Sequence, residues 1–176
     1  MRDDGPPFPV KSLPVSRREF LRIGCTTISG PLVAGMAPAL ASAAISKDDV
    51  YPPMDVVALD SVKEDAPVLF SYPDAASPAV LLRLRQPATN GIGPNNTIVA
   101  YSGLCTHKGC PVAFRPERKL LICPCHWSSF DPAKAGQMVI GQGSQSLPQI
   151  ALRLSGKMIQ ATGVTGLIYG RETNIL

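Results

Sequence analysis

Histidine is scarce in this chain of 176 residues, which contains only two. Both lie in short cysteine-containing loops near the middle of the sequence, so no further histidine is left for acid–base catalysis. We also find no pair of catalytic carboxylates and no nucleophile motif. These absences argue against a substrate pocket on this chain, and no catalytic residue is predicted.

The chain also has no large excess of positive or negative charge. The chain has 17 Lys and Arg against 13 Asp and Glu, a formal net charge of +4. Five of these basic residues and three of the acidic ones precede residue 44, which leaves twelve basic and ten acidic residues, a net charge of +2. Without a run of like charge, nothing indicates a nucleic-acid partner. The remaining length suits one compact domain.

The segment at residues 1–43 is typical of an export signal. Arg17 and Arg18 precede a mildly apolar run at residues 23–45, which is the twin-arginine (Tat) pattern of bacterial export. Small residues near the end of the segment resemble a cleavage site. The sequence therefore predicts a periplasmic protein whose signal is removed.

A retained membrane anchor is the alternative interpretation of this segment. The apolar run is just long enough to cross a bilayer, which needs about 20 residues. Pro31, Pro38 and three glycines interrupt the run, so it would be a poor span. Membrane association is expected, if at all, only through this segment.

Two loops contain the residues with metal-binding chemistry. Residues 105–110 read Cys-Thr-His-Lys-Gly-Cys, and residues 123–128 read Cys-Pro-Cys-His-Trp-Ser. Thiolate and imidazole together suit a soft, redox-capable metal centre. A tetrahedral zinc ion could use two cysteines and two histidines, but six candidates are too many for one such ion. A Rieske-type [2Fe–2S] cluster uses two cysteines on one iron and two histidines on the other.

Both loops match the paired motifs of Rieske iron–sulfur proteins, C-T-H-x-G-C and C-P-C-H-x-S, and the chain resembles that family. The resemblance implies one [2Fe–2S] Rieske cluster. It also implies a role for each cysteine and histidine: Cys105 and Cys123 on the inner iron, His107 and His126 on the outer iron, and a disulfide between Cys110 and Cys125. A structural disulfide persists in an oxidising compartment, which agrees with export.

Two further positions are expected to tune the reduction potential. Ser128 matches the residue whose hydroxyl bonds a cluster sulfide in high-potential members of the family. Phe130 stands where respiratory-chain members of that type carry a tyrosine, whose hydroxyl bonds a ligand sulfur. We therefore expect a potential below that subgroup but above the dioxygenase ferredoxins.

Many prolines, glycines and β-branched residues favour strands and turns over helices. We predict an all-β fold, a Rieske-type antiparallel β sandwich, over residues 44–176. Its expected parts are a base at residues 50–101 and 147–176 and an inserted cluster-binding subdomain at residues 102–146. Residues 166–169 are expected to form the last strand, residues 114–118 a polar connection, and residues 141–148 a flexible return.

Within the family, the chain resembles the small subunit of periplasmic arsenite oxidase. The similarity lies in the twin-arginine signal, the short length and the motifs Cys-Thr-His-Lys-Gly-Cys-Pro-Val, Gly141-Gln142 and Leu147-Pro148-Gln149-Ile150. It implies an electron-transfer subunit partnered by a large molybdopterin subunit that oxidises arsenite to arsenate. A soluble cytochrome c or an azurin-like copper protein would accept the electrons.

Two alternatives are the Rieske subunit of a quinol–cytochrome c oxidoreductase and a free-standing Rieske ferredoxin. Phe130 and the weak apolar run argue against the first alternative. Export and the disulfide argue against the second.

Overall fold

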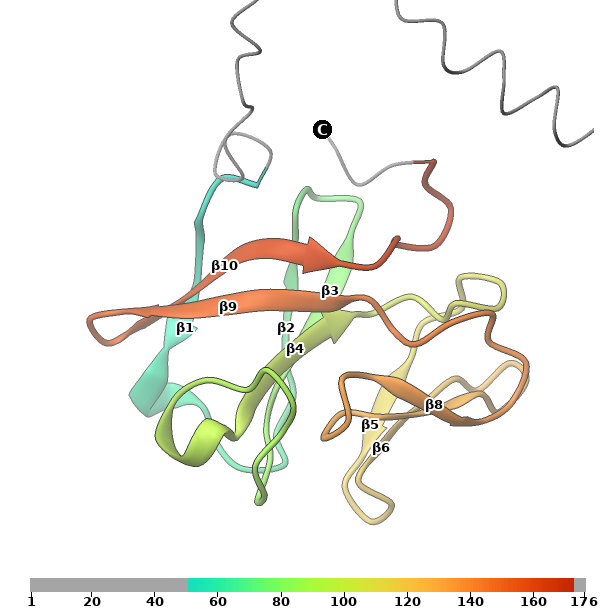
Figure 1. Ribbon diagram of the computed structural model, residues 1–176, viewed down its shortest axis with the longest axis horizontal. Helices are drawn as coiled ribbons and strands as arrows, with labels where there is room; N and C mark the ends of the chain where they lie inside the picture. The colour runs from blue at the N-terminus through green and yellow to red at the C-terminus, as the bar shows by residue number, and fades with distance from the viewer. Residues whose placement is uncertain (1–50, 173–176) are drawn as a thin grey trace, which may run out of the picture. The chain divides into compact units, whose positions relative to one another are not determined.

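The computed structural model describes residues 51–172, so the expected export signal lies outside the described residues. This range forms ten strands in two antiparallel sheets, with two short 3-10 turns (Figure 1). The predicted all-β class is confirmed. Within residues 51–172, no helix has the length and apolar character needed to cross a membrane.

The strands are β1 (Met54–Ala58), β2 (Val68–Ser71), β3 (Pro78–Arg83), β4 (Ile98–Ser102), β5 (Ala113–Arg115), β6 (Leu120–Ile122), β7 (Ser129–Asp131), β8 (Gln137–Ile140), β9 (Gln149–Ser155) and β10 (Met158–Thr165). The 3-10 turns are η1 (Leu59–Ser61) and η2 (Pro94–Asn96). The six-stranded sheet has the order β1-β10-β9-β4-β3-β2, and the four-stranded sheet has the order β5-β6-β7-β8.

The six-stranded sheet curls around one hydrophobic core. Its central strands contribute fully buried side chains, namely Ala79, Leu81, Ile98, Ala100, Ile150, Ile159 and Ala161. The edge strands β1 and β2 both add partly buried residues to this same cluster, including Met54 and Phe70. Since strands at opposite ends of the sheet order share one core, the sheet must be strongly curved.

Strand β4 joins this core to a second one. All five of its residues are buried, because alternate side chains point to opposite faces of a strand. Ile98 and Ala100 face the first core, whereas Val99 and Tyr101 pack with Leu121 and other residues of the four-stranded sheet. The chain leaves β4 directly into the first cysteine–histidine loop, so this loop starts from the best-packed strand of the fold.

Two strand predictions are wrong. Residues 166–169 form no strand; instead β10 continues to Thr165, and the chain leaves the sheet at Gly166, whose φ is +90°. The connection expected at residues 114–118 begins with β5, which pairs with β6. Phe114 is buried there, and Pro116 lies just beyond the strand, where it interrupts no ladder hydrogen bond.

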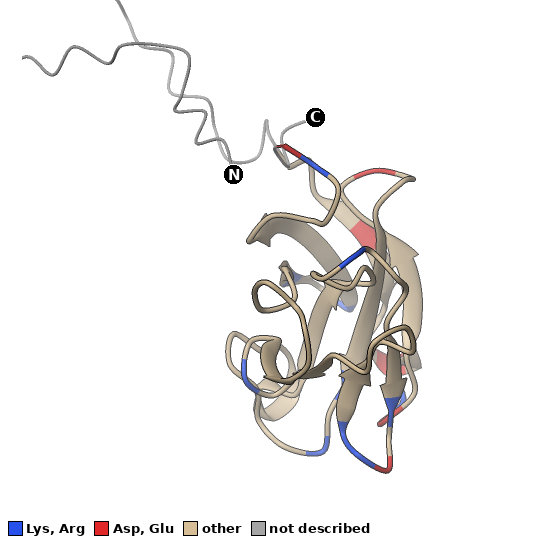
Figure 2. Cartoon of the chain, turned by 90° about the vertical axis from the view of Figure 1, so that its right-hand side faces the viewer, with Lys and Arg blue, Asp and Glu red and all other residues tan. Residues whose placement is uncertain are grey.

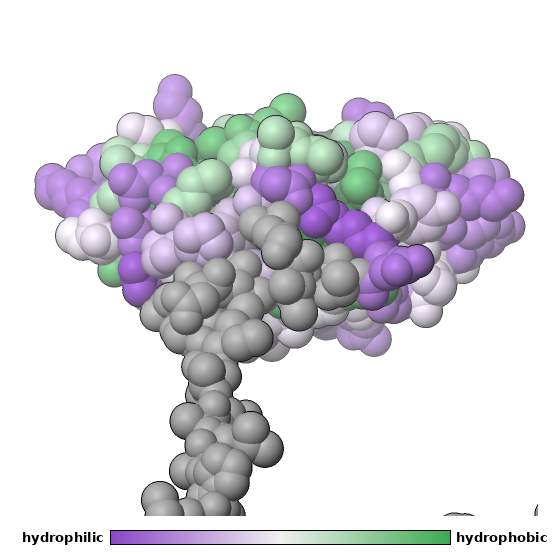
Figure 3. Space-filling view, turned by 90° about the horizontal axis from the view of Figure 1, so that it is seen from above, coloured by the Kyte–Doolittle hydropathy of each residue, from purple (hydrophilic) through white to green (hydrophobic). Residues whose placement is uncertain are grey.

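Charged residues lie mainly in loops and near strand ends, with both signs interspersed (Figure 2). Seen from above, hydrophobic residues form separate groups between hydrophilic ones (Figure 3). Three of the most exposed large hydrophobic residues belong to β8 and to the loop before β7: Val139, Ile140 and Trp127, at 59%, 67% and 68% exposure. The four-stranded sheet and its loops therefore present more apolar surface than their small size requires.

A buried hydrogen bond between the two sheets gives a first prediction. The Tyr101 hydroxyl donates to the Pro132 carbonyl at 2.8 Å, which ties β4 to the turn between β7 and β8. Tyr101→Phe would leave that carbonyl without its donor, so we expect the free energy of unfolding to fall by about 1–3 kcal/mol. Urea denaturation of both proteins would measure the change.

Tyr72→Phe is the matched control. Its hydroxyl is equally buried but has no hydrogen-bond partner among the described residues. Burial raises the pKa of both phenols, that of Tyr72 to about 12, so each stays protonated across the working range. Removing the Tyr72 hydroxyl should be neutral or stabilising. Equal losses in the two variants would contradict the assigned role of Tyr101.

Candidate metal centre

The first loop, between β4 and β5, is closed by two backbone hydrogen bonds. The Cys105 N–H donates to the Cys110 carbonyl, and the Gly109 N–H donates to the Cys105 carbonyl, both at 2.9 Å. Gly109 has a φ of +70°, a conformation that glycine adopts without steric cost. The turn brings the two ends of the loop together and leaves His107 at its centre.

The second loop, between β6 and β7, repeats this pattern at the same sequence offsets. The Cys123 N–H donates to the Ser128 carbonyl at 2.9 Å, and the Trp127 N–H donates to the Cys123 carbonyl at 3.0 Å. Trp127 therefore occupies the position of Gly109 and has a φ of +62°, a conformation that bulky residues rarely adopt. The two loops therefore have equivalent backbone turns, with glycine at the positive-φ position of the first and tryptophan at that of the second.

A disulfide between Cys110 and Cys125 joins the two loops, as predicted. The sulfur atoms of Cys110, Cys123 and Cys125 all lie within 4.8 Å of one another. This group could look like a metal site of its own, but two of its sulfurs are bonded to each other. Of these three cysteines, only Cys123 is free to act as a thiolate ligand.

The structure brings the four predicted ligands to one place. Cys105 and Cys123 are free and buried, each 1% exposed. His107 is half-buried and His126 is exposed, and their ring centroids are 4.7 Å apart. The sulfur side of the site thus faces the protein core, and the imidazole side faces outward.

The electrostatics of this site suit a bound metal cluster. Burial raises the pKa of the Cys105 thiol, whereas hydrogen bonds from the His107 backbone and the Ser128 hydroxyl lower it. The Nδ1 atom of His107 is buried and has no hydrogen-bond partner among the described residues. Buried thiolates need a metal or donors, and a buried ring nitrogen needs a partner. Two thiols and two imidazoles in this arrangement fit a Rieske-type [2Fe–2S] cluster.

The two predicted tuning residues lie against these ligands. Ser128 is fully buried, and its Oγ accepts a hydrogen bond from the Gln142 N–H at 3.0 Å. Because that bond uses an oxygen lone pair, the Ser128 hydroxyl hydrogen is free to point at the Cys105 sulfur. Phe130 is also fully buried and packs in the same core as both cysteines.

Residues 141–148 are not the flexible return that the sequence predicts. This segment makes hydrogen bonds with both the side chain and the backbone carbonyl of Thr106 in the first loop. The Thr106 hydroxyl donates to the Gln145 carbonyl at 2.8 Å, and the Ser144 hydroxyl donates to the Thr106 carbonyl at 2.9 Å. A Cβ atom on Gly143 would lie 2.8 Å from Thr106 Oγ1, so a glycine is needed there. The glycines of this segment are the sequence feature that could have indicated its close packing.

Residues 53–151 match the family of the Rieske [2Fe-2S] domain. The chain therefore belongs to this family, and its cofactor is one Rieske cluster. Similarity also extends across nearly the whole chain. The chain is 36% identical over 163 residues to "Iodate reductase subunit IdrB" of Denitromonas iodatirespirans, and the alignment covers 91% of this chain and 86% of that protein. It is 35% identical over 162 residues to the protein of the same name from a Pseudomonas strain, covering 90% and 84%.

A solved structure supports the fold. The soluble domain of the Rieske protein II (soxF) from Sulfolobus acidocaldarius aligns with a TM-score of 0.58 and 24% identity, covering 65% of this chain and 78% of that one. The family match and the relatives identify the chain as a Rieske electron-transfer subunit. Arsenite specificity stays a prediction.

Removal of the Ser128 hydroxyl tests the electrostatics of the site. Hydrogen bonds to the sulfur atoms stabilise the more negative, reduced form, so Ser128→Ala should lower the midpoint potential by on the order of tens of millivolts. Redox titration followed by EPR would measure the shift. Ser129→Ala is the control, because the neighbouring hydroxyl is also buried but donates to the Trp127 carbonyl. A similar shift in both variants would refute a specific role for Ser128.

The opposite change is expected at Phe130. Phe130→Tyr would add a hydroxyl within the core that contains the ligand cysteines, and we expect the midpoint potential to rise. Phe114→Tyr adds the same group elsewhere in this core and should leave the potential unchanged. The same redox titration applies, and an unchanged midpoint in Phe130→Tyr would sink this account of the position.

Proposed function

We propose that this chain is the Rieske subunit of a periplasmic, two-subunit oxyanion oxidoreductase. In this proposal Cys105 and Cys123 hold the inner iron, and His107 and His126 hold the outer iron. The observation that carries the proposal is the similarity to iodate reductase subunits along about nine-tenths of the chain. Cysteines facing inward and histidines facing outward agree with an electron relay.

The bound cluster would supply one-electron redox chemistry at a fairly high potential, since neutral imidazoles replace two thiolates. The residues of this chain determine where on its surface the electrons are exchanged. Buried Cys105 and Cys123 are shielded by the core, whereas His126 is exposed and His107 half-exposed. Electrons would therefore enter and leave through the two imidazole edges, where a partner protein can approach.

The oxyanion itself would react on a partner. The proposed partner is a large molybdopterin-containing subunit, and a soluble cytochrome c or an azurin-like protein would exchange electrons with the complex. The absence of a catalytic carboxylate pair or nucleophile motif in the sequence supports a relay role for this chain. The twin-arginine pattern at Arg17 and Arg18 supports export to the periplasm after cluster insertion.

Two oxyanions are candidates for the complex. Arsenite is the first, because of the motifs that this chain shares with arsenite oxidase small subunits. Its oxidation to arsenate takes up one water oxygen and releases two electrons and two protons, so the relay would carry the electrons outward one at a time. Iodate is the second, favoured by the relatives with that name. Its reduction would draw electrons inward through the same relay.

Low-temperature EPR of the native complex separates these functions. If arsenite is the substrate, anaerobic arsenite added to the oxidised complex will produce a rhombic Rieske signal. If iodate is the substrate, arsenite will have no effect, and iodate will abolish the signal of the reduced complex. Sulfate serves as the inert oxyanion control.

Two results would contradict the proposal. A signal that appears with a quinol, but responds to neither arsenite nor iodate, would favour a quinol–cytochrome c oxidoreductase. A chain that purifies alone, without a large subunit, would favour a free-standing ferredoxin.

A further inference from the structure

The chain after β10 forms a short C-terminal strap, defined here as residues 166–172. It leaves the six-stranded sheet at Gly166 and passes over the first ligand loop. Ile168 is 1% exposed, so the strap is packed against the protein at its centre. Figure 1 shows this dark red segment continuing from the end of β10. The strap contributes no ligand, and the proposed function assigns it no role.

One strap residue sits directly on the first ligand loop. A Cβ atom placed on Gly109 would lie 2.5 Å from Cδ1 and 2.7 Å from Cε1 of Tyr169. The aromatic ring therefore occupies the space that the side chain of any larger residue at position 109 would require. Gly109 in turn donates its N–H to the Cys105 carbonyl, the bond that closes the loop. Tyr169 thus supports the turn that contains Cys105 and His107.

A second contact reaches the same loop through Gln145. The Gln145 side-chain amide donates to the Leu167 carbonyl of the strap at 2.9 Å. The backbone carbonyl of Gln145 accepts the Thr106 hydroxyl at 2.8 Å. Thr106 lies between Cys105 and His107, so the strap and the loop are linked through one intermediate residue.

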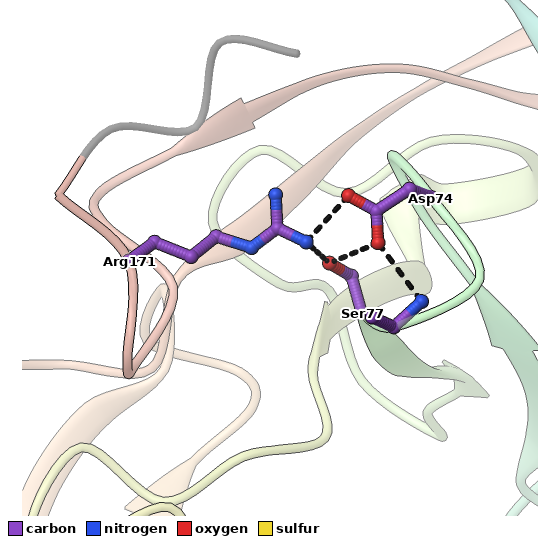
Figure 4. Close-up of polar contacts among 4 residues, drawn as sticks. Asp74, Ser77 and Arg171 are labelled. Carbon is purple, nitrogen blue, oxygen red and sulfur yellow. Dashed lines mark hydrogen bonds and ion pairs between the residues drawn. The ribbon is translucent and has the colours of Figure 1, made fainter.

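The end of the strap is fastened to the six-stranded sheet. Arg171 Nη2 donates to Asp74 Oδ2 and to Ser77 Oγ in the turn between β2 and β3 (Figure 4). The Arg171 and Asp74 side chains are only 21% and 29% exposed. The Asp74 carboxylate also accepts the Ala76 N–H at 2.9 Å and the Ser77 hydroxyl at 3.1 Å, so the anchor point is itself fixed.

This ion pair differs from an isolated surface pair. The hydrogen bond from Arg171 lowers the pKa of the Asp74 carboxyl, so the carboxylate stays ionised. Charge-assisted bonds within a network are stronger than neutral ones, and partial burial reduces screening by solvent. The Arg171–Asp74 latch closes a chain segment of 97 residues, which makes it a long-range tie rather than a local turn contact.

We propose that the strap is a positioning device for the first ligand loop. Tyr169 is a positioning residue that acts through Gly109, and the Arg171–Asp74 latch holds Tyr169 in place. The inference rests on the proposed ligand roles of Cys105 and His107. Its consequence is that the turn between β2 and β3, which is distant in sequence from Cys105 and His107, controls how often this loop opens.

Hydrogen exchange in the full-length, cluster-containing chain tests this proposal. Arg171→Ala and Tyr169→Ala should each speed exchange in peptides covering residues 103–112 by about threefold or more, because local opening becomes easier. Both variants should also lose the Rieske EPR signal faster in air. Tyr169→Phe keeps the ring over Gly109 and should match the unaltered chain. Arg153→Ala removes an exposed arginine bonded to Gln160 on β10 and is the matched control.

A double-mutant cycle distinguishes the latch from general destabilisation. If Arg171 acts through Asp74, the double variant Arg171→Ala/Asp74→Ala should exchange no faster than either single variant. Additive effects, or exchange that increases equally in peptides of β9, would overturn the proposal. So would unchanged exchange and signal lifetime in both Arg171→Ala and Tyr169→Ala.

Failure of the proposed function gives a different result. If the unaltered chain shows no Rieske signal, the ligand assignments fail and the positioning role fails with them. If the unaltered chain shows the signal but the variants behave like it, only the strap inference is overturned.

Discussion

The disulfide between Cys110 and Cys125 is the bond on which the site depends, because it joins two loops that leave different strands. The first loop follows β4, which is anchored in both hydrophobic cores, and the second follows β6 of the four-stranded sheet. The pairing of β5 with β6 places the two loops side by side, and the disulfide ties the loops themselves together. With it, two buried thiols and two outward imidazoles stay within one small volume.

The loops also show how tertiary structure can override local preference. Gly109 and Trp127 occupy equivalent positions with φ values of +70° and +62°. Glycine adopts this conformation freely, whereas tryptophan adopts it at an energetic cost. Trp127 is 68% exposed, so its own packing returns little of that cost. The hydrogen bond from its N–H to Cys123 and the pairing of Cys123 with Ser128 hold the backbone in this conformation.

The sequence was sufficient for the parts of the structure that depend on local chemistry. Ligand-type residues at fixed spacing indicated both loops, and the resemblance to the Rieske family implied their disulfide. The many prolines, glycines and β-branched residues indicated an all-β fold. What could not be predicted depends on contacts between distant residues. Tyr169 packs on Gly109, Gln145 bonds Thr106, and Arg171 bonds Asp74. No periodicity or spacing encodes such pairs, so residues 141–148 were expected to be flexible and residues 166–169 to form a strand.

The central claim is that one [2Fe–2S] cluster is held by two cysteines and two histidines. Its most direct test is pulsed EPR of the reduced chain labelled with ¹⁵N-histidine, combined with iron and sulfide analysis. The account predicts two iron and two sulfide per chain and couplings from two histidine nitrogens. A chain that binds zinc, or a cluster without histidine nitrogen coupling, would contradict it.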